Sequence, residues 1–258
     1  MLIITTPAKG MDEEKINLDI KSTTPRFLEK TKIVMDNLKK LEIPEIASLM
    51  KVNDKIAELT FMRNQEWKVY DGENIKPAVL SFSGEVYRGI DAINFSSDEL
   101  EFCNRKLRIL SGMYGSLRPL DGMMPYRLEM GTKISVDGSK DLYDFWNEEL
   151  TESIIIDALS SGEEVIINLA SNEYAKVLKL KKKINVINIV FKERKGIKYR
   201  TVVVHTKKAR GMMINYIVKN KIENSEKLKK FDYEGYEFSR ELSDDNNFVF
   251  TRDPQILN

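Results

Sequence analysis

The sequence contains one cysteine, Cys103, and one histidine, His205, among 258 residues. A single cysteine excludes an intramolecular disulfide, a zinc ribbon and a CxxC redox pair. A single histidine excludes a metal site built from several imidazoles, so we predict neither a metal nor another cofactor. Cys103 has helical spacing with Leu100 and Leu107, which favours a buried thiol. His205 is predicted to end a strand, where a structural imidazole is favoured over a catalytic one. A thiol peroxidase is therefore not expected.

Long apolar runs are missing as well. The longest, residues 154–156 and 202–204, are far shorter than the roughly 20 residues that cross a bilayer. No basic-then-apolar leader precedes residues 2–5, which are predicted to form the first strand. We therefore expect a cytoplasmic protein without a membrane partner. Hydrophobic residues make up 42% and charged residues 31%, the balance of a globule with a sizeable core, and we predict one domain over residues 1–258. The sequence carries no signal for the oligomeric state.

The formal net charge is only +1, but the charges are segregated along the chain. Residues 174–221 contain fifteen Lys and Arg and one acidic residue, Glu193, which gives this segment +14 and the remainder −13. Folding can gather such cations on one face that binds a polyanion. Alternatively, a lysine-rich edge keeps strands from pairing with other chains. The charge pattern alone leaves both interpretations open.

The hydrophobic periodicity predicts strands mixed with helices. A Thr24-Pro25 pair is typical of a helix start, a capping box spans Ser96 and Glu99, and a turn at Lys195-Gly196 indicates a hairpin. Strands are predicted over residues 2–5, 78–82, 107–110, 165–169, 186–191, 197–206 and, at the sheet edge, 248–251. Helices are predicted over residues 25–41, 44–50, 54 to about 63, 96–104, 141–160 and 209–217. This order favours an α/β fold with α+β character, in which helices flank a mixed sheet rather than a doubly wound parallel one.

The segment over residues 111–138 is a long glycine-rich loop in this prediction. It holds five glycines and no sustained periodicity, and it follows a strand, where open α/β sheets place ligand crevices. Arg118 and Arg127 would offer planar guanidinium groups to phosphate or carboxylate. Alternatively, they pair with Asp121 and Glu129 and pin an Ω-like loop.

Two further features suggest an anion site. Lys9 follows the first predicted strand and could provide a point charge. Lys207, Lys208 and Arg210 are predicted to open a helix, where cations oppose the helix dipole and a bound anion would be favoured by both the dipole and the side chains.

Several motifs follow one another in an order that resembles the YaaA family of bacterial peroxide-stress proteins. They are Pro7-Ala8-Lys9, the segment 84–89 (GEVYRG), the segments 111–115 and 117–121 (SGMYG and LRPLD), 125–131 (PYRLEMG), 141–146, 168–174 and 207–211 (KKARG). The resemblance spans nearly the whole chain, and the ordered set is specific.

The resemblance implies a cytosolic α/β protein that helps cells survive hydrogen peroxide by limiting damage linked to unincorporated iron. It also implies DNA binding through a basic cleft and a helix-hairpin-helix element, which by position covers residues from about 45 to 63. That hairpin has no glycine here, so Lys51, Asn53 and Lys55 would contact phosphate through side chains.

Two functions emerge. The first is largely sequence-independent DNA binding, to duplex or structured DNA, and it favours a binding protein over an enzyme. Its candidate residues are Lys9, Lys51, Asn53, Lys55, Arg118, Arg127, Lys181, Lys182, Lys183, Lys207, Lys208 and Arg210. The alternative is an enzyme that acts on a small anionic or nucleotide-like substrate, in a pocket formed by residues 111–131, Lys9 and the segment 168–174. Its candidate catalytic and orienting residues are Lys9, Tyr114, Asp121, Glu129 and Glu173.

Overall fold

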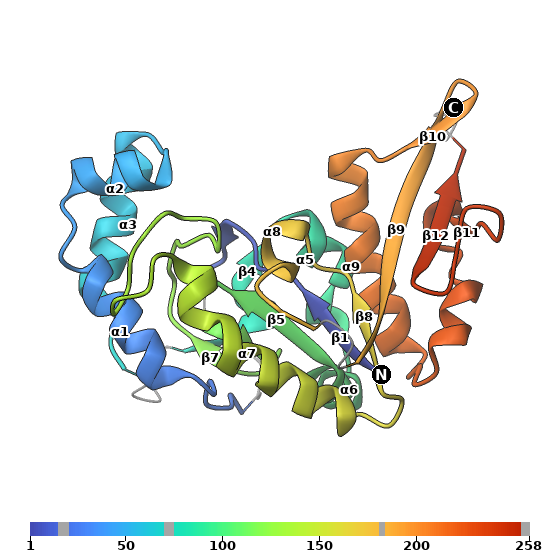
Figure 1. Cartoon of the computed structure of the whole chain (residues 1–258), viewed down its shortest axis with the longest axis horizontal. Coiled ribbons are helices and arrows are strands. Elements are labelled where there is room, and N and C mark those ends of the chain that lie inside the picture. Colours follow the sequence, from blue (N-terminus) through green and yellow to red (C-terminus); the bar gives the residue numbers. More distant parts are fainter. Residues whose placement is uncertain (15–20, 70–74, 181–183, 254–258) are drawn as a thin grey trace.

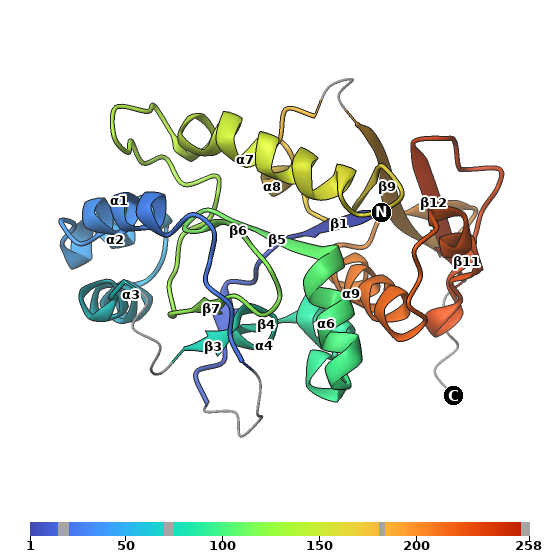
Figure 2. The same cartoon turned by 90° about the horizontal axis from the view of Figure 1, so that it is seen from below.

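The computed structural model describes residues 1–14, 21–69, 75–180 and 184–253, in which helices cover both faces of one mixed sheet (Figures 1 and 2). The strands are β1 (Leu2–Thr5), β2 (Gly10–Met11), β3 (Lys76–Pro77), β4 (Phe82–Ser83), β5 (Leu107–Ser111), β6 (Gly115–Leu117), β7 (Gly122–Met123), β8 (Val165–Asn168), β9 (Asn185–Lys195), β10 (Lys198–Arg200), β11 (Glu237–Phe238) and β12 (Asn247–Arg252). The helices are α1 (Leu28–Leu38), α2 (Ile43–Met50), α3 (Asp54–Glu66), α4 (Ala78–Ser81), α5 (Glu85–Ile90), α6 (Ser97–Lys106), α7 (Leu142–Leu159), α8 (Asn172–Ala175) and α9 (Val203–Lys219), with short 3-10 turns η1 (Ala92–Asn94), η2 (Ser225–Lys230) and η3 (Tyr233–Gly235). Among these residues, no helix combines the length and apolarity that a membrane span requires.

The main sheet has the strand order β11-β12-β9-β8-β1-β5-β6, and β10 pairs with β9 beside this path. Strands β5, β1, β8, β9 and β12 run parallel, whereas β6, β10 and β11 are antiparallel to their neighbours. The predicted mixed sheet is therefore confirmed, although most of it is parallel. Strand β1 is completely buried in the middle, as its apolar sequence requires of a strand covered on both faces. Strand β12 was expected at the edge but lies between β9 and β11.

Long helices cover the two faces of the sheet. Figure 2 shows α7 on one face and α6 and α9 on the other. The predicted α7 is confirmed. The structure shows in addition that the Asp141 side chain accepts a hydrogen bond from the Asp144 backbone N–H and that Ser160 ends the helix. The predicted capping box of α6 is also present, between Ser96 and Glu99.

Three local predictions are wrong. Residues 78–81 form the short helix α4 rather than a strand, because a brief apolar run fits a buried helical turn as well as a strand. Residues 197–206 form a strand only over β10, and α9 begins at Val203 despite the β-branched residues there. The Thr206 backbone N–H donates to the Val202 carbonyl at 2.8 Å, so this turn is helical although Val203 and Val204 are exposed. Helix α1 begins at Leu28, three residues later than the Thr24-Pro25 pair indicated.

The segment 111–138 is built into the body of the protein rather than lying on its surface. It contains β6, which pairs with β5, and β7, which pairs with β3. The Ser111 hydroxyl accepts hydrogen bonds from the backbone N–H groups of Met113 and Tyr114, and the Trp146 indole N–H donates to the Gly112 carbonyl at 2.9 Å. These bonds satisfy backbone groups that burial would otherwise leave unpaired.

Helices α5 and α9 pack at backbone contact through two glycines. A Cβ on Gly211 would overlap the carbonyl oxygen of Val86, and a Cβ on Gly89 would lie 2.8 Å from the backbone nitrogen of Met212. Glycine is therefore the residue that both positions require, and the pair fixes α9 against α5.

We predict that Gly211→Ala destabilises the protein by about 2 kcal/mol, because the overlap with α5 outweighs the roughly 1 kcal/mol by which alanine favours a helix over glycine. Urea unfolding followed by circular dichroism measures the change, with Glu148→Ala on the exposed side of α7 as the control. A Gly211→Ala protein as stable as the wild type would show that the two helices can separate without cost.

Candidate functional site

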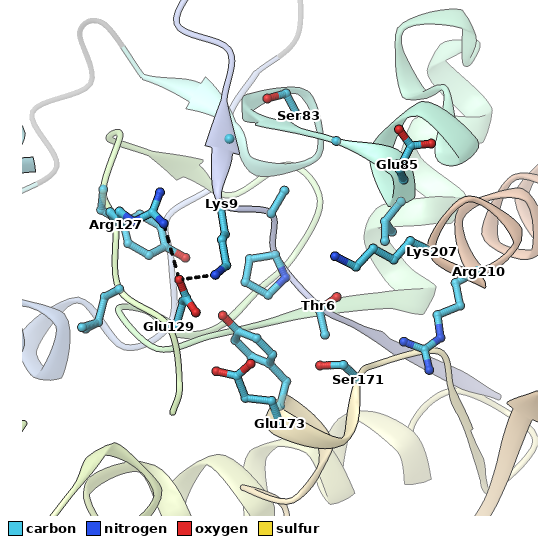
Figure 3. Close-up of a pocket in the computed structure, with 18 residues that line it drawn as sticks. Thr6, Lys9, Ser83, Glu85, Arg127, Glu129, Ser171, Glu173, Lys207 and Arg210 are labelled. Atoms are coloured by element: carbon cyan, nitrogen blue, oxygen red, sulfur yellow. Dashed lines mark ion pairs between the residues drawn. The ribbon is translucent and has the colours of Figure 1, made fainter. Parts of the chain in front are cut away.

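A cavity of about 450 Å³ opens at the carboxyl edge of the parallel strands, where the chain leaves β1 and β8 (Figure 3). The chain from β1 leads to β5 on one side, and the chain from β8 leads to β9 on the other. Adjacent strands with diverging connections leave a crevice, which is where open α/β sheets bind ligands. The walls are Thr6, Pro7, Ala8, Lys9, Gly10, Ser83, Gly84, Glu85, Val86, Tyr126, Arg127, Leu128, Glu129, Ser171, Glu173, Tyr174, Lys207 and Arg210.

One wall carries a three-residue ionic contact. The Glu129 carboxylate forms an ion pair with the Lys9 ammonium at 2.8 Å, and it also lies 3.6 Å from the Arg127 guanidinium. The alternative interpretation, in which Arg127 pairs with Glu129 and pins the loop, is therefore partly correct. The Arg127 side chain nevertheless also lines the cavity. Lys9 and Lys207 point into the cavity from opposite walls (Figure 3).

The opposite wall comes from α9, and its position corrects a prediction. The cluster Lys207, Lys208 and Arg210 lies beyond the first turn of α9, which begins at Val203. The expected opposition between these cations and the N-terminal dipole is therefore wrong, because the dipole acts mainly on the first turn. Lys208 forms an ion pair with Glu234 and does not line the cavity, whereas Lys207 and Arg210 do.

Two guanidinium groups of the cavity carry a nitrogen with an unmet hydrogen bond. Within the described part of the chain, the Nε atoms of Arg127 and Arg210 are buried and have no hydrogen-bond partner. Burial lowers the pKa of Arg210, which reflects the cost of keeping that charge away from water. A buried donor without a partner is unfavourable, and an anion in the cavity would offset the charge of both guanidinium groups.

The carboxylates of the cavity are already engaged. Glu173 accepts the backbone N–H of Gly131 at 3.0 Å, and Glu85 pairs with Arg88 at 2.8 Å. With Glu129 held by Lys9, these acids do not neutralise Lys207 or Arg210. Burial also raises the pKa of Tyr174, so its hydroxyl stays protonated and can donate.

Several candidates lie outside the cavity. Arg118 pairs with Asp121 at 3.0 Å, and the buried Tyr114 hydroxyl accepts the Trp67 indole N–H at 3.1 Å. Lys51, Asn53 and Lys55 are exposed around the turn between α2 and α3, where the Asn53 side chain caps α3. Lys181, Lys182 and Lys183 lie outside the described residues.

Neither of the two scarce residues lines the cavity. Cys103 is buried in α6, and burial raises the pKa of its thiol to about 12, so almost no thiolate forms near neutrality. His205 was expected at a strand end but lies in the first turn of α9, 2.7 Å from Glu193. Burial alone would raise the pKa of Glu193, but hydrogen bonds from His205, Tyr236 and Arg252 keep it below its usual value. The residues described contain no group of three or more His, Cys, Asp or Glu that could hold a metal ion.

Sequence reasoning missed Ser83 and Glu85, which line the cavity beside Lys9. Gly84 adopts φ +136°, a conformation that favours glycine, and it connects β4 to α5. The sequence did single out the segment 84–89 as one of the motifs that resemble the family, but no function was assigned to it.

We predict that Arg210→Met raises the free energy of unfolding by about 1 kcal/mol in buffer without phosphate or sulfate, because it removes a buried charge with an unpaired donor. The same variant loses the stabilisation that added inorganic phosphate gives the wild type. Denaturant unfolding with and without phosphate measures both effects. Lys208→Met, which removes a half-exposed ion pair, serves as the control and shifts stability by less than about 1 kcal/mol. If Arg210→Met is the less stable protein without anions, the guanidinium already has a stabilising role in the empty cavity.

Comparison with known proteins places the chain in a family. A family model described as Peroxide stress protein YaaA matches residues 1–242. A UPF0246 protein of Clostridium perfringens is 53% identical over 255 residues, which cover 98% of this chain and 100% of that protein. UPF0246 proteins of Saccharophagus degradans and Clostridium botulinum are 44% and 43% identical and cover 98% and 97% of this chain and 99% of their own lengths. The model match over nearly the full length, together with these relatives, shows that this chain belongs to the YaaA peroxide stress protein family.

Proposed function

We propose that this protein protects cytosolic DNA during peroxide stress by binding it through phosphate contacts, largely without reading base sequence. The observation that carries the proposal is the pair of guanidinium groups, Arg127 and Arg210, that face one cavity with buried, unpartnered Nε atoms. Arginine matches the geometry of phosphate oxygens, and contacts to phosphate give affinity without sequence information. Lys9 and Lys207 line the same cavity and add positive charge.

The turn between α2 and α3 is proposed as a second contact, the helix-hairpin-helix-like element over residues 45 to 63. Lys51 has φ 53° and ψ 52° at the end of α2, a left-handed conformation that glycine adopts more easily. Because Asn53 is engaged in capping α3, Lys51 and Lys55 would make the phosphate contacts there.

Protection against iron follows from the same binding. Protein cations that neutralise phosphates release the counterions condensed on DNA. Ferrous ions are such counterions, so a bound protein would keep iron, and the radicals it forms from peroxide, away from the bases. This route needs neither a metal site nor a redox-active side chain in the protein.

We predict that the affinity for a short labelled duplex falls steeply with salt, with log K decreasing by about 0.9 per phosphate neutralised for every tenfold rise in salt. Lys207→Glu combined with Arg210→Glu weakens binding at least about tenfold, because it reverses the charge of two proposed phosphate contacts. Fluorescence anisotropy with two unrelated duplex sequences measures both effects.

The control for this experiment is Lys227→Glu combined with Lys230→Glu. It makes the same change in net charge on η2, outside the cavity. Equal binding by the wild type and the cavity variant would remove the cavity from the DNA interface.

A second candidate is an enzyme that acts on a small anionic or nucleotide-like substrate. The cavity volume of about 450 Å³ falls within the usual range for small-molecule sites and favours this alternative. Of the candidate residues, Lys9, Glu129 and Glu173 line the cavity, whereas Tyr114 and Asp121 do not. Lys9 with Glu129 would then transfer protons while Arg127 and Arg210 hold the anion.

For this alternative we predict that a nucleoside monophosphate or a phosphorylated metabolite raises the melting temperature of the wild type by several degrees, and not that of Arg210→Met. A thermal-shift screen with inorganic phosphate as the reference ligand tests it. A screen in which duplex DNA stabilises the protein and no small anion exceeds inorganic phosphate would reject the enzyme.

A further inference from the structure

We infer that the ribbon formed by β9 and β10 is a further DNA-contacting element, which holds phosphates with its lysines and inserts Ile197 at its tip into a groove of the duplex. This inference rests on the proposed DNA binding and adds an element that the cavity does not include.

The ribbon projects from the same edge of the sheet as the cavity. Strands β1, β8 and β9 are parallel, so their carboxyl ends share one edge. Asn168, at the end of β8, pairs with Asn188, yet β9 continues to Lys195, roughly 20 Å further at the usual rise per residue. Figure 1 shows the ribbon rising above the rest of the sheet. A long ligand that approached this edge of the sheet could therefore meet both elements.

The tip of the ribbon is apolar and uncovered. Ile197 is 93% exposed, the highest value among the large hydrophobic side chains described, and it follows Gly196 at φ +64°. An isoleucine held in water at the end of a hairpin gains nothing for folding. Proteins that bind the minor groove insert apolar side chains such as isoleucine between base steps and bend the duplex.

The flanks of the ribbon are cationic in an arrangement that opposes folding. Lys195 lies directly opposite Lys198 in the antiparallel register, and like charges in that position destabilise a ribbon. Arg200 extends the series on β10, where every residue is exposed. Arg200 lies opposite Glu193 in the same register, and Asp253 pairs with Arg194 at 3.4 Å, so these two acids offset charge at the base of the ribbon and leave the repulsion between Lys195 and Lys198 near the tip. A polyanion would relieve the repulsion, and a duplex supplies phosphates on both sides of a groove.

Cations and apolar groups continue from the ribbon into the cavity wall. Val203 and Val204, at the start of α9, are exposed, and Lys207 and Arg210 follow one and two turns later. Exposed cationic and apolar side chains thus occur on the ribbon, apolar ones at the start of α9, and cations in the cavity wall that α9 forms.

The test uses the full-length protein, a duplex labelled at both ends for fluorescence resonance energy transfer, and three variants. Ile197→Ser should abolish the protein-induced change in end-to-end distance, reduce affinity roughly tenfold and leave the salt slope unchanged, because it removes an apolar contact and no charge. Lys195→Gln combined with Lys198→Gln should reduce the magnitude of the salt slope by about 1.8, corresponding to two phosphates. Ile156→Ser, at a 62% exposed isoleucine on α7, is the matched control and should change neither readout.

The outcomes separate this inference from the proposed function. If Arg210→Ala abolishes binding while the ribbon variants bind and bend DNA as the wild type does, the ribbon inference fails and the cavity stands. If the wild type binds no duplex at low salt, both fail.

Vesicles containing an anionic phospholipid form the last arm, since exposed apolar and basic groups also suit a membrane surface. Loss of vesicle binding in Ile197→Ser, with DNA binding intact, would overturn the inference in favour of a membrane contact.

Discussion

The close approach of α5 and α9 at Gly89 and Gly211 sets the position of the cations that α9 contributes to the cavity. Helix α5 begins directly after the cavity-lining residues Ser83 and Gly84, so a helix packed on it at backbone distance must present one of its sides to the cavity. A side chain larger than hydrogen at either glycine would push α9 outward and carry Lys207 and Arg210 with it. The packing of α9 on α5 therefore also fixes where Lys207 and Arg210 lie in the cavity wall.

The cavity brings together charges from distant parts of the sequence. Lys9, Arg127, Lys207 and Arg210 meet because parallel strands place their carboxyl ends, and the segments that follow, at one edge of the sheet. The arrangement costs stability in the unliganded protein, since buried guanidinium nitrogens lack partners while the neighbouring acids are engaged elsewhere. Functional sites commonly break the rules of stable folding in this way, and the rest of the structure compensates.

Much of the fold could be predicted from local patterns, because apolar strands and capped helices carry strong signals. Strand β1, helix α7 and the turn at Lys195-Gly196 were all predicted. The start of α9 was not, since consecutive valines favour a strand locally, whereas here they form an exposed first turn of a helix whose buried residues begin at Thr206. For the same reason the sequence grouped Lys208 with Lys207 and Arg210, although helical geometry turns Lys208 toward Glu234.

The types and order of the residues predicted a site for an anion, but they did not predict which of the cations would line one cavity. Arg118 and Arg127 were equivalent in sequence, each near an acid, yet Arg118 pairs with a buried Asp121 outside the cavity. Which of two similar arginines is buried beside a cavity depends on how the segment 111–138 folds back on the sheet. No local pattern encodes that path.

The burial of Cys103 has a consequence for a protein that belongs to a peroxide-stress family. Sulfur is the atom in proteins most easily oxidised, and its reaction requires access and, for cysteine, the thiolate. Methionines 1, 35, 113, 123, 130, 212 and 213 are buried in the same core, whereas Met62 is 57% exposed. The core thus shields eight of the twelve sulfur atoms in the chain, and Met11, Met50 and Met124 are partly buried, so oxidation by peroxide would reach Met62 before the sulfur atoms that hold the fold.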